Sequence, residues 1–255
     1  MKILSVIKGL AGLALGAVIS VQASADVLKI AVSANFHSAL KELVTPFEKQ
    51  TGDKVAISVG STGALYNQIS HGAPFDLFLA ADKRRPQMLV DAGKALDKPV
   101  TYAYGRLAYW KPGAGKVAYQ TIKAEKGRIA IANPRTAPYG LAAQQVLEHM
   151  GLLDTKKHQL VQGNNIAQTW QFVKTGNVPS GFVALSQLRA DNVTGDYLVL
   201  KEDLYDRIEQ QAVIPKSAPN SRLAQKFLEY LEGEAQQKQI QDAGYYPGVH
   251  PTGHK

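Results

Sequence analysis

The chain has 255 residues, a formal net charge of +8 and no cysteine. The absence of cysteine excludes disulfides, thiol catalysis and cysteine-based zinc sites, and the length suits one large domain or two lobes with separate cores. The basic balance favours attraction of a small anion over nucleic acid binding, because clusters that mix aromatic and basic residues are missing.

The first 25 residues have the pattern of a secretory signal peptide. Lys2 and Lys8 accompany the apolar stretch GLAGLALGAVISV, and residues 23–25 (Ala-Ser-Ala) supply a small-x-small cleavage site. An N-terminal membrane anchor is the alternative, but the stretch is short and no second apolar run of spanning length follows. We expect an exported protein that begins at Asp26, with a net charge reduced to +6 by the loss of the two lysines.

After Asp26, short runs rich in Val and Ile alternate with amphipathic stretches. This alternation is typical of βα units over a largely parallel sheet, so the sequence predicts an α/β fold. In this first series we expect strands over 27–33, 54–59 and 75–81, and helices over 36–50, 64–70 and 85–93.

The pattern changes at residues 101–113, TYAYGRLAYWKPG, an extended run that is broken by glycine and ends in a turn signal. A second series of strands and helices follows this break. It contains expected strands over 128–132, 158–163 and 181–185, helices over 141–151 and 167–176, an extended run over 208–215, and helices over 221–233 and 235–244.

The C-terminal helices carry an apolar stripe that must be buried, formed by Leu223, Phe227, Leu228 and Leu231. We expect them to return to the first part of the chain. The prediction is therefore a first lobe of 26–105 and 210–255 and a second lobe of 106–209. Two crossings, near Gly105 and Gln210, would form a hinge around a cleft.

Four predicted strand-to-helix junctions contain small, hydroxyl or amide residues where a helix begins: residues 33–36 (SANF), 60–63 (GSTG), 133–140 (NPRTAPYG) and 163–167 (GNNIA). Each junction could present backbone N–H groups to an anion, as helix N-termini do. Ordinary helix capping is the simpler interpretation of any single junction. Four junctions, spread over both predicted lobes, favour a shared anion site.

Neutral donors are sufficient for such a site. A hydrogen bond to a charged partner contributes about 1.5 to 3 kcal/mol, so roughly six exceed the approximately 8 kcal/mol of micromolar binding before ordering costs. A site made only of donors disfavours phosphate, which keeps a proton near neutral pH. Molybdate, tungstate and sulfate all remain open on these grounds.

Two stretches resemble the periplasmic molybdate-binding protein family: residues 59–82, VGSTGALYNQISHGAPFDLFLAAD, and residues 133–147, NPRTAPYGLAAQQVL. The resemblance runs through the mature chain. It implies a two-lobed, type II periplasmic-binding-protein fold, with mixed, mostly parallel sheets and a ligand cleft between the lobes. It also implies a periplasmic, monomeric receptor that delivers molybdate or tungstate to an ABC transporter permease, with no cofactor and no cation site.

The resemblance also implies the residues that contact the oxyanion. Asn35 and Thr62 would donate from side chains and backbone, and Tyr139 and Ile166 would donate backbone N–H groups, with Ser61 as a neighbouring candidate. Some family members have a tyrosine ligand where this chain has Ala184. The identity of the fifth donor is therefore open in this chain, and Ser33 or Ala34 lies near the required position.

Two other functions compete with this interpretation. A sulfate receptor would use the same helix termini. A secreted hydrolase would use Ser61 as its nucleophile, but GSTG lacks the Gly-x-Ser-x-Gly pattern and no base is placed beside it.

Several other polar and aromatic residues are better explained by structural roles. We expect Asp76 and Asp82 to cap strand ends, and Trp110 and Trp170 to pack in the core. His250 and His254, near the C-terminus, are expected to be solvated.

Overall fold

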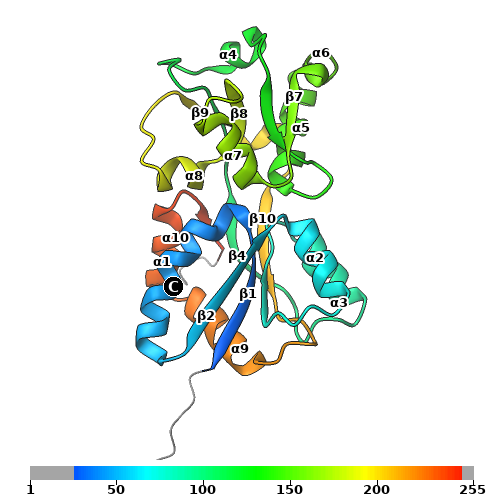
Figure 1. Cartoon of the computed structure of the whole chain (residues 1–255), viewed down its shortest axis with the longest axis vertical. Coiled ribbons are helices and arrows are strands. Elements are labelled where there is room, and N and C mark those ends of the chain that lie inside the picture. Colours follow the sequence, from blue (N-terminus) through cyan, green and yellow to red (C-terminus); the bar gives the residue numbers. More distant parts are fainter. Residues whose placement is uncertain (1–25, 249–255) are drawn as a thin grey trace, which may run out of the picture.

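The computed structural model describes residues 26–248 and contains two lobes joined by extended chain segments (Figure 1). The predicted signal peptide, His250 and His254 lie outside the described residues. The first lobe is built on a six-stranded sheet of order β11-β4-β10-β3-β1-β2, and the second on a five-stranded sheet of order β7-β6-β8-β5-β9. The chain is therefore a two-lobed α/β protein with two mixed sheets, as predicted, but within residues 26–248 five strand pairs are antiparallel and four are parallel, so the sheets are not mostly parallel.

The first sheet is mixed. Its parallel part pairs β1 (Val27–Ser33) with β2 (Lys54–Gly60) and β3 (Leu77–Leu79). Its antiparallel part pairs β3 with β10 (Ile208–Val213), which pairs with β4 (Val100–Gly105), which in turn pairs with β11 (Tyr246–Pro247). The central strands β1 and β3 are almost wholly buried, as expected for strands covered by helices on both faces.

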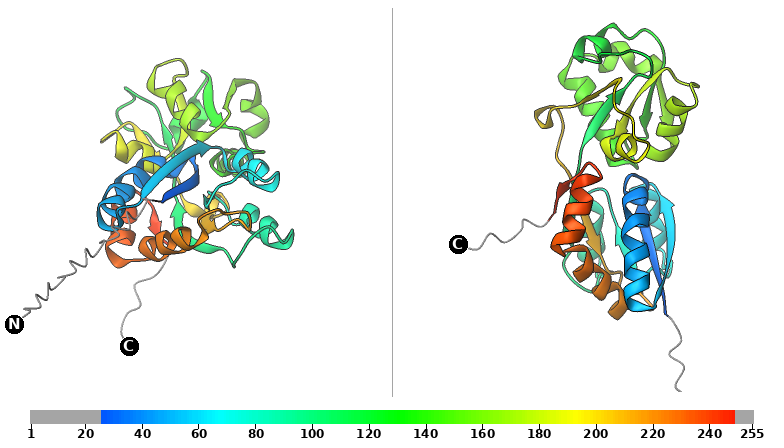
Figure 2. Two further views of the ribbon diagram at one scale, coloured as in Figure 1. Left: turned by 60° about the horizontal axis from the view of Figure 1, so that its bottom comes forward. Right: turned by 90° about the vertical axis from the view of Figure 1, so that its left-hand side faces the viewer.

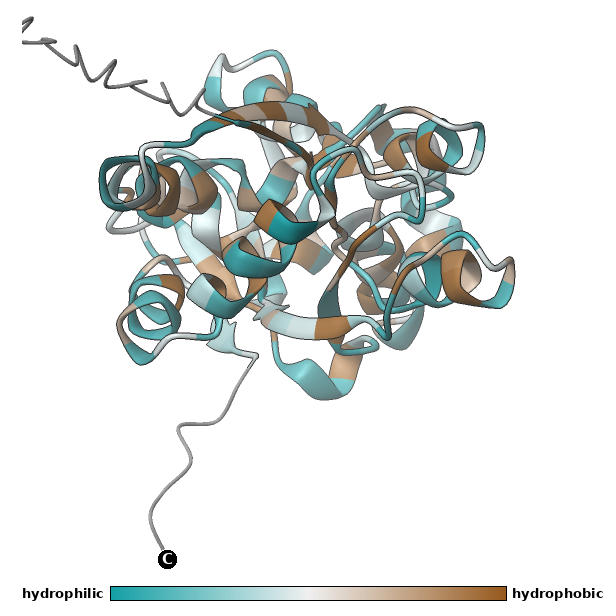
Figure 3. Ribbon diagram, turned by 90° about the horizontal axis from the view of Figure 1, so that it is seen from below, coloured by the Kyte–Doolittle hydropathy of each residue, from teal (hydrophilic) through white to brown (hydrophobic). Residues whose placement is uncertain are grey.

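Helices cover both faces of this sheet. One face carries α1 (His37–Thr51), α9 (Ser221–Leu231) and α10 (Glu234–Asp242), which share one core with alternate residues of β1. The other face carries α2 (Thr62–Ser70) and α3 (Arg84–Asp91). Seen from below, hydrophobic and hydrophilic residues alternate along the outer helices, as amphipathic packing requires (Figure 3).

The second lobe repeats this layered arrangement on a smaller scale. Its strands are β5 (Leu107–Trp110), β6 (Ile129–Ala132), β7 (Leu160–Gly163), β8 (Ser180–Ala184) and β9 (Tyr197–Val199). One face packs against α5 (Pro138–His149), and the other against α7 (Ile166–Lys174) and α8 (Leu185–Ala190). The short helices α4 (Tyr119–Ala124) and α6 (Leu153–Lys156) complete the lobe.

The chain passes between the sheets twice, from β4 to β5 and from β9 to β10 (Figure 2). A single residue, Arg106, separates β4 from β5. The helices α9 and α10 pack on the first sheet, which is where the apolar stripe was expected to be buried. The lobe boundaries at 105/106 and 209/210 stay a prediction.

Most predicted elements are present, and the differences are local. The strand expected over 75–81 is limited to β3, and the extended run over 101–113 is two strands that belong to different sheets. The sequence patterns did not predict α4, α6, α8, β9 or β11, all of them short. No helix within residues 26–248 is long and apolar enough to cross a membrane.

The two tryptophans pack in the core, as expected. Trp110 and Trp170 are buried and stack on one another, with ring centroids 4.3 Å apart. Asp76, fully buried before β3, accepts hydrogen bonds from the backbone N–H groups of Lys29 at 2.7 Å and Asn220 at 2.6 Å. Asp82, after β3, accepts from the N–H of Arg85 and forms an ion pair with its guanidinium group.

Candidate functional site

Two hydroxyl groups meet where β1 ends and α2 begins. Ser33 Oγ and Thr62 Oγ1 lie 2.8 Å apart, and the backbone N–H of Ala81 donates to both oxygens, at 3.0 and 3.4 Å. Parallel pairing of β1 with β2 and β3 places the carboxyl ends of these three strands, next to which Ser33, Thr62 and Ala81 lie, at one edge of the sheet. Because one hydroxyl proton is used between the two oxygens, the pair keeps one proton to donate elsewhere.

The first turn of α2 combines a cap with free donor positions. Ser61 Oγ accepts from the N–H of Ala64 at 3.3 Å, so the capping interpretation holds at this junction. The N–H of Thr62 remains at the first helical position, where no acceptor exists within the helix. Capping and anion binding are therefore compatible in this turn.

Asn35 lies in the 3-10 turn η1 (Ala34–Phe36), which follows β1 directly. Its Nδ2 donates to Gln210 Oε1 at 2.8 Å and lies 3.4 Å from the Tyr245 hydroxyl oxygen. Its carbonyl oxygen accepts from the hydroxyls of Tyr245 and Ser186. The side-chain amide is thus committed to the protein, which leaves the backbone N–H as the natural donor to a ligand.

Tyr139 and Ile166 lie in the first turns of two second-lobe helices that face the first lobe. Tyr139 is the second residue of α5, after Pro138, and Ile166 is the first residue of α7, after a cap in which Asn165 Oδ1 accepts from the N–H of Gln168. Both backbone N–H groups therefore lie in first turns. Ala34 from the first lobe packs in the same apolar cluster as Tyr139 and Ile166.

The structure thus brings the predicted residues together from both lobes. None of the seven, Ser33, Ala34, Asn35, Ser61, Thr62, Tyr139 and Ile166, is more than 8% exposed. Within residues 26–248, none of them is hydrogen-bonded to a carboxylate, so their immediate partners are neutral. Helix N-termini add partial positive charge without a formal cation.

The lobes are closed over this site. Hydrogen bonds join them beside α2 and beside α8. They run from Gly63 N to Thr136 O at 2.9 Å, from Arg85 Nη2 to Arg135 O at 2.8 Å, and from Ser186 Oγ to Asn35 O at 3.1 Å. A guest held by the helix termini would be enclosed by protein.

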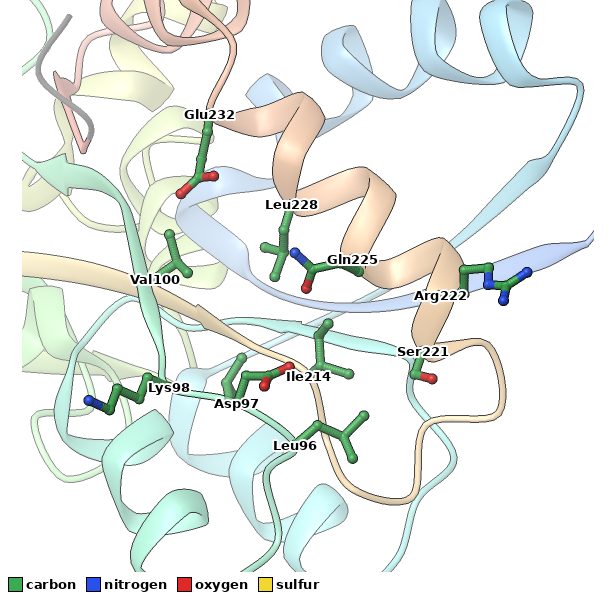
Figure 4. Close-up of a pocket in the computed structure, with 11 residues that line it drawn as sticks. Leu96, Asp97, Lys98, Val100, Ile214, Ser221, Arg222, Gln225, Leu228 and Glu232 are labelled. Atoms are coloured by element: carbon green, nitrogen blue, oxygen red, sulfur yellow. The ribbon is translucent and has the colours of Figure 1, made fainter. Parts of the chain in front are cut away.

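One large groove of the surface does not include any of the predicted ligand residues. The groove in Figure 4, about 540 Å³ in volume, lies in the first lobe between α9 and the strands β4 and β10. It is lined by apolar residues such as Val100 and Leu228 and by charges of both signs, including Lys98 and Glu232. Its carboxylates, Asp97 and Glu232, make it less suited to an anion than the neutral donors of the helix termini.

Sequence patterns did not identify three residues of the site: Ala81, Ser186 and Gln210. Ala81 contributes a backbone N–H, which no side-chain pattern marks. Ser186 lies in α8, a helix too short to show periodicity. Gln210 was placed at a lobe crossing, but its bond to Asn35 depends on a contact between distant parts of the chain.

Comparison with known proteins agrees with this architecture. Residues 28–246 match the family model described as bacterial extracellular solute-binding protein. The chain belongs to this solute-binding protein family. It is 43% identical over 239 residues to the molybdate-binding protein ModA of Azotobacter vinelandii, covering 91% of this chain and 95% of that protein. It is 36% identical to ModA of Rhodobacter capsulatus, covering 93% and 95%.

Solved structures of solute-binding proteins show the same fold. The Azotobacter vinelandii periplasmic molybdate-binding protein aligns with a TM-score of 0.82 and 39% identity, covering 88% of this chain and 99% of that chain. The sulfate-binding protein SubI of Mycobacterium tuberculosis aligns with a TM-score of 0.75 at 13% identity, over 89% and 88% of the two chains. The second comparison supports the fold alone.

The contacts of Ser61 bear on the hydrolase alternative. Its hydroxyl accepts from Ala64, and no His, Asp or Glu side chain is hydrogen-bonded to it among the described residues. Within residues 26–248, there is also no group of three or more His, Asp or Glu side chains arranged to hold a metal ion.

Proposed function

We propose that this solute-binding protein captures molybdate between its two lobes and delivers it to an ABC importer. The observation that carries the proposal is the convergence of four segments that begin helices, two from each lobe, with neutral donors. Hydrogen bonds between the lobes, beside α2 and beside α8, hold these segments together. The 43% identity to ModA of Azotobacter vinelandii, over nearly the whole of both chains, supports molybdate as the guest.

The proposed ligands are mainly backbone groups. The N–H groups of Asn35, Thr62, Tyr139 and Ile166 bind the oxyanion, and the Ser33–Thr62 hydroxyl pair supplies one further proton. With the N–H of Ala34, this gives about six hydrogen bonds to a dianion, enough for micromolar or tighter binding. Ser61 orients the first turn of α2 as its cap.

A set of donors without an acceptor selects fully deprotonated oxyanions. Tungstate fits the same donors as molybdate, so we propose that it binds as well. Hydrogen phosphate leaves its own proton without an acceptor in a buried site, which costs about 1 to 3 kcal/mol.

Several further properties belong to the same proposal. The protein acts as a monomer in the periplasm after loss of residues 1–25, presents the closed, loaded form to a membrane permease, and has no catalytic activity, cofactor or nucleic acid partner. The basic balance of the sequence assists capture of an anion by raising its local concentration.

Calorimetric titration of the mature chain with sodium molybdate tests the proposed function. We expect saturable binding of one anion per protein, with a dissociation constant of about 1 µM or below. Binding of sulfate with equal affinity would favour the sulfate receptor instead.

A further inference from the structure

Four buried tyrosines surround the crossing between the lobes: Tyr102, Tyr139, Tyr205 and Tyr245. Burial raises the pKa of the Tyr139 hydroxyl, and the nearby Tyr245 hydroxyl raises it further. Three of the four have clear partners. Tyr102 donates to Ala80 O at 3.1 Å, Tyr245 donates to Asn35 O at 2.6 Å, and Tyr205 accepts from Leu107 N at 3.2 Å. Among residues 26–248 the Tyr139 hydroxyl makes no hydrogen bond of normal geometry, although the nearby Asn35 side chain lowers its pKa.

Gln210, at the same crossing, also has a buried polar atom without a partner among residues 26–248. Its Oε1 accepts from Asn35 Nδ2 at 2.8 Å and from the Tyr102 hydroxyl at 3.1 Å. Its Nε2, a donor, has no partner among residues 26–248, although the residue is fully buried. A buried donor without an acceptor is costly, so a partner is expected close by.

Gly105 lies beside both of these groups, which are not hydrogen-bonded to one another in this structure. A Cβ atom built on Gly105 would overlap the Tyr139 hydroxyl oxygen and lie 2.8 Å from Gln210 Nε2. A hydroxyl oxygen accepts and an amide Nε2 donates, so the two groups are chemically matched. They come from different lobes, because Tyr139 lies in α5 of the second lobe and Gln210 in β10 of the first sheet.

We propose that, when the anion is bound, a small rotation of the two side chains pairs the Tyr139 hydroxyl, as acceptor, with Gln210 Nε2 beside Gly105, and that this hydrogen bond holds the lobes closed on the anion. The proposal rests on the proposed function, in which the backbone N–H of Tyr139 binds the oxyanion. In this proposal Tyr139 binds the anion through its backbone N–H and contacts the hinge through its ring hydroxyl. The hydroxyl is therefore a positioning group. Gln210 in turn positions Asn35, because its Oε1 accepts a hydrogen bond from Asn35 Nδ2.

The substitution Tyr139→Phe tests the contact, because it removes the hydroxyl and keeps the backbone donor. We expect molybdate affinity to fall about three- to tenfold, mainly through faster dissociation measured by stopped flow. The thermal stability of the ligand-free protein should stay unchanged, which a purely structural role of the hydroxyl would not predict. Tyr109→Phe is the matched control, since Tyr109 is equally buried and its hydroxyl also makes no hydrogen bond of normal geometry among residues 26–248, but it lies near Ser180 and Glu125 in the second lobe.

A second pair of variants tests the geometry at Gly105. Gly105→Ala places a methyl group against both polar atoms and should weaken binding about ten- to hundredfold. In the double variant with Tyr139→Phe, loss of the hydroxyl relieves the overlap, so we expect part of the affinity to return.

The outcomes separate this inference from the proposed function. Wild-type protein that fails to bind molybdate would contradict both. Wild-type protein that binds, together with Tyr139→Phe protein of unchanged affinity and dissociation rate, would overturn this inference alone. Strictly additive losses in the Gly105→Ala and Tyr139→Phe double variant would also overturn it.

Discussion

The backbone N–H of Gly63 donates to the carbonyl oxygen of Thr136 at 2.9 Å, so the first turn of α2 is bonded directly to the second lobe. The residue before Gly63 is a proposed ligand, and the residue three positions after Thr136 is another. Anion binding and lobe closure therefore use the same two segments, and a change that hinders one should hinder the other.

Gly63→Ala should weaken molybdate binding about tenfold while leaving the ligand-free fold at least as stable. A Cβ at this position would lie 3.1 Å from Thr136 Cα and 3.0 Å from Arg85 Nη2, so it obstructs closure. Alanine is also the better helix former in the first turn of α2, which favours the fold. Calorimetry and thermal unfolding of both proteins measure these two effects.

Gly195→Ala is the matched control for Gly63→Ala, because a Cβ at Gly195 meets nothing within 4 Å. It should bind like wild type. Equal affinity in the Gly63→Ala protein would show that closure at this contact is not needed for binding.

Thr62→Val should reduce molybdate affinity about tenfold or more, since it removes a hydroxyl from the pair that supplies one proton to the anion. The valine keeps the side-chain volume and the backbone N–H. Thr45→Val, at an exposed threonine whose hydroxyl bonds to Lys41 O in α1, is the control. Unchanged affinity in the Thr62→Val protein would remove this hydroxyl from the site.

Asp76→Ala should lower the free energy of unfolding by about 3 kcal/mol. The substitution leaves the backbone N–H groups of Lys29 and Asn220 without their carboxylate acceptor in a fully buried position. The exposed Asp91, replaced in the same way, should change stability little. Urea unfolding of the two variants makes the comparison, and equal midpoints would refute the structural role of Asp76.

Glu125 should make folding stability depend on pH in the acid range. Burial alone raises the pKa of this carboxyl, but hydrogen bonds from Lys111, Gly127 and Ser180 outweigh that effect and hold the pKa below its ordinary value of 4.5. Its folded pKa lies below its unfolded pKa, so Glu125 contributes stability above about pH 4.5 that is lost as pH falls through the folded pKa.

The variant Glu125→Gln isolates this contribution. It should be less stable than wild type at pH 7, and the difference should shrink as pH falls towards about 3. Chemical unfolding at several pH values measures the two curves. A constant difference across the range would show that ionisation of Glu125 contributes nothing.

Much of the fold followed from local patterns in the sequence. The strand β1 and the helices α1, α5, α7 and α9 are long or strongly periodic, so each was predicted within a few residues. The helix α8 and the strand β9 were missed because six and three residues are too few to show a period. The strand predicted over 75–81 was too long, since its first residues approach β3 as a turn.

Part of the candidate site could also be predicted from the sequence. The hydroxyl and amide residues at the starts of helices are local signals that marked the four junctions, and the family resemblance then implied Thr62 and Asn35 as ligands. The roles of Gln210 and Ser186 depend on contacts between segments more than a hundred residues apart, and no local pattern reports these. The commitment of the Asn35 side chain to Gln210, instead of to the ligand, belongs to this second class.

Thermal unfolding of the mature protein with equal concentrations of molybdate, sulfate and phosphate tests most directly whether the closed lobes select a fully deprotonated oxyanion of this kind. A ligand that binds only the folded state raises its stability, by about 2.7 kcal/mol at one hundred times the dissociation constant. We predict a rise in melting temperature with molybdate and none with phosphate, which keeps a proton that a site made of donors cannot accept; an equal rise with sulfate would favour the sulfate receptor. An equal rise with phosphate would contradict the donor-only site, and no rise with molybdate would contradict the proposed function itself.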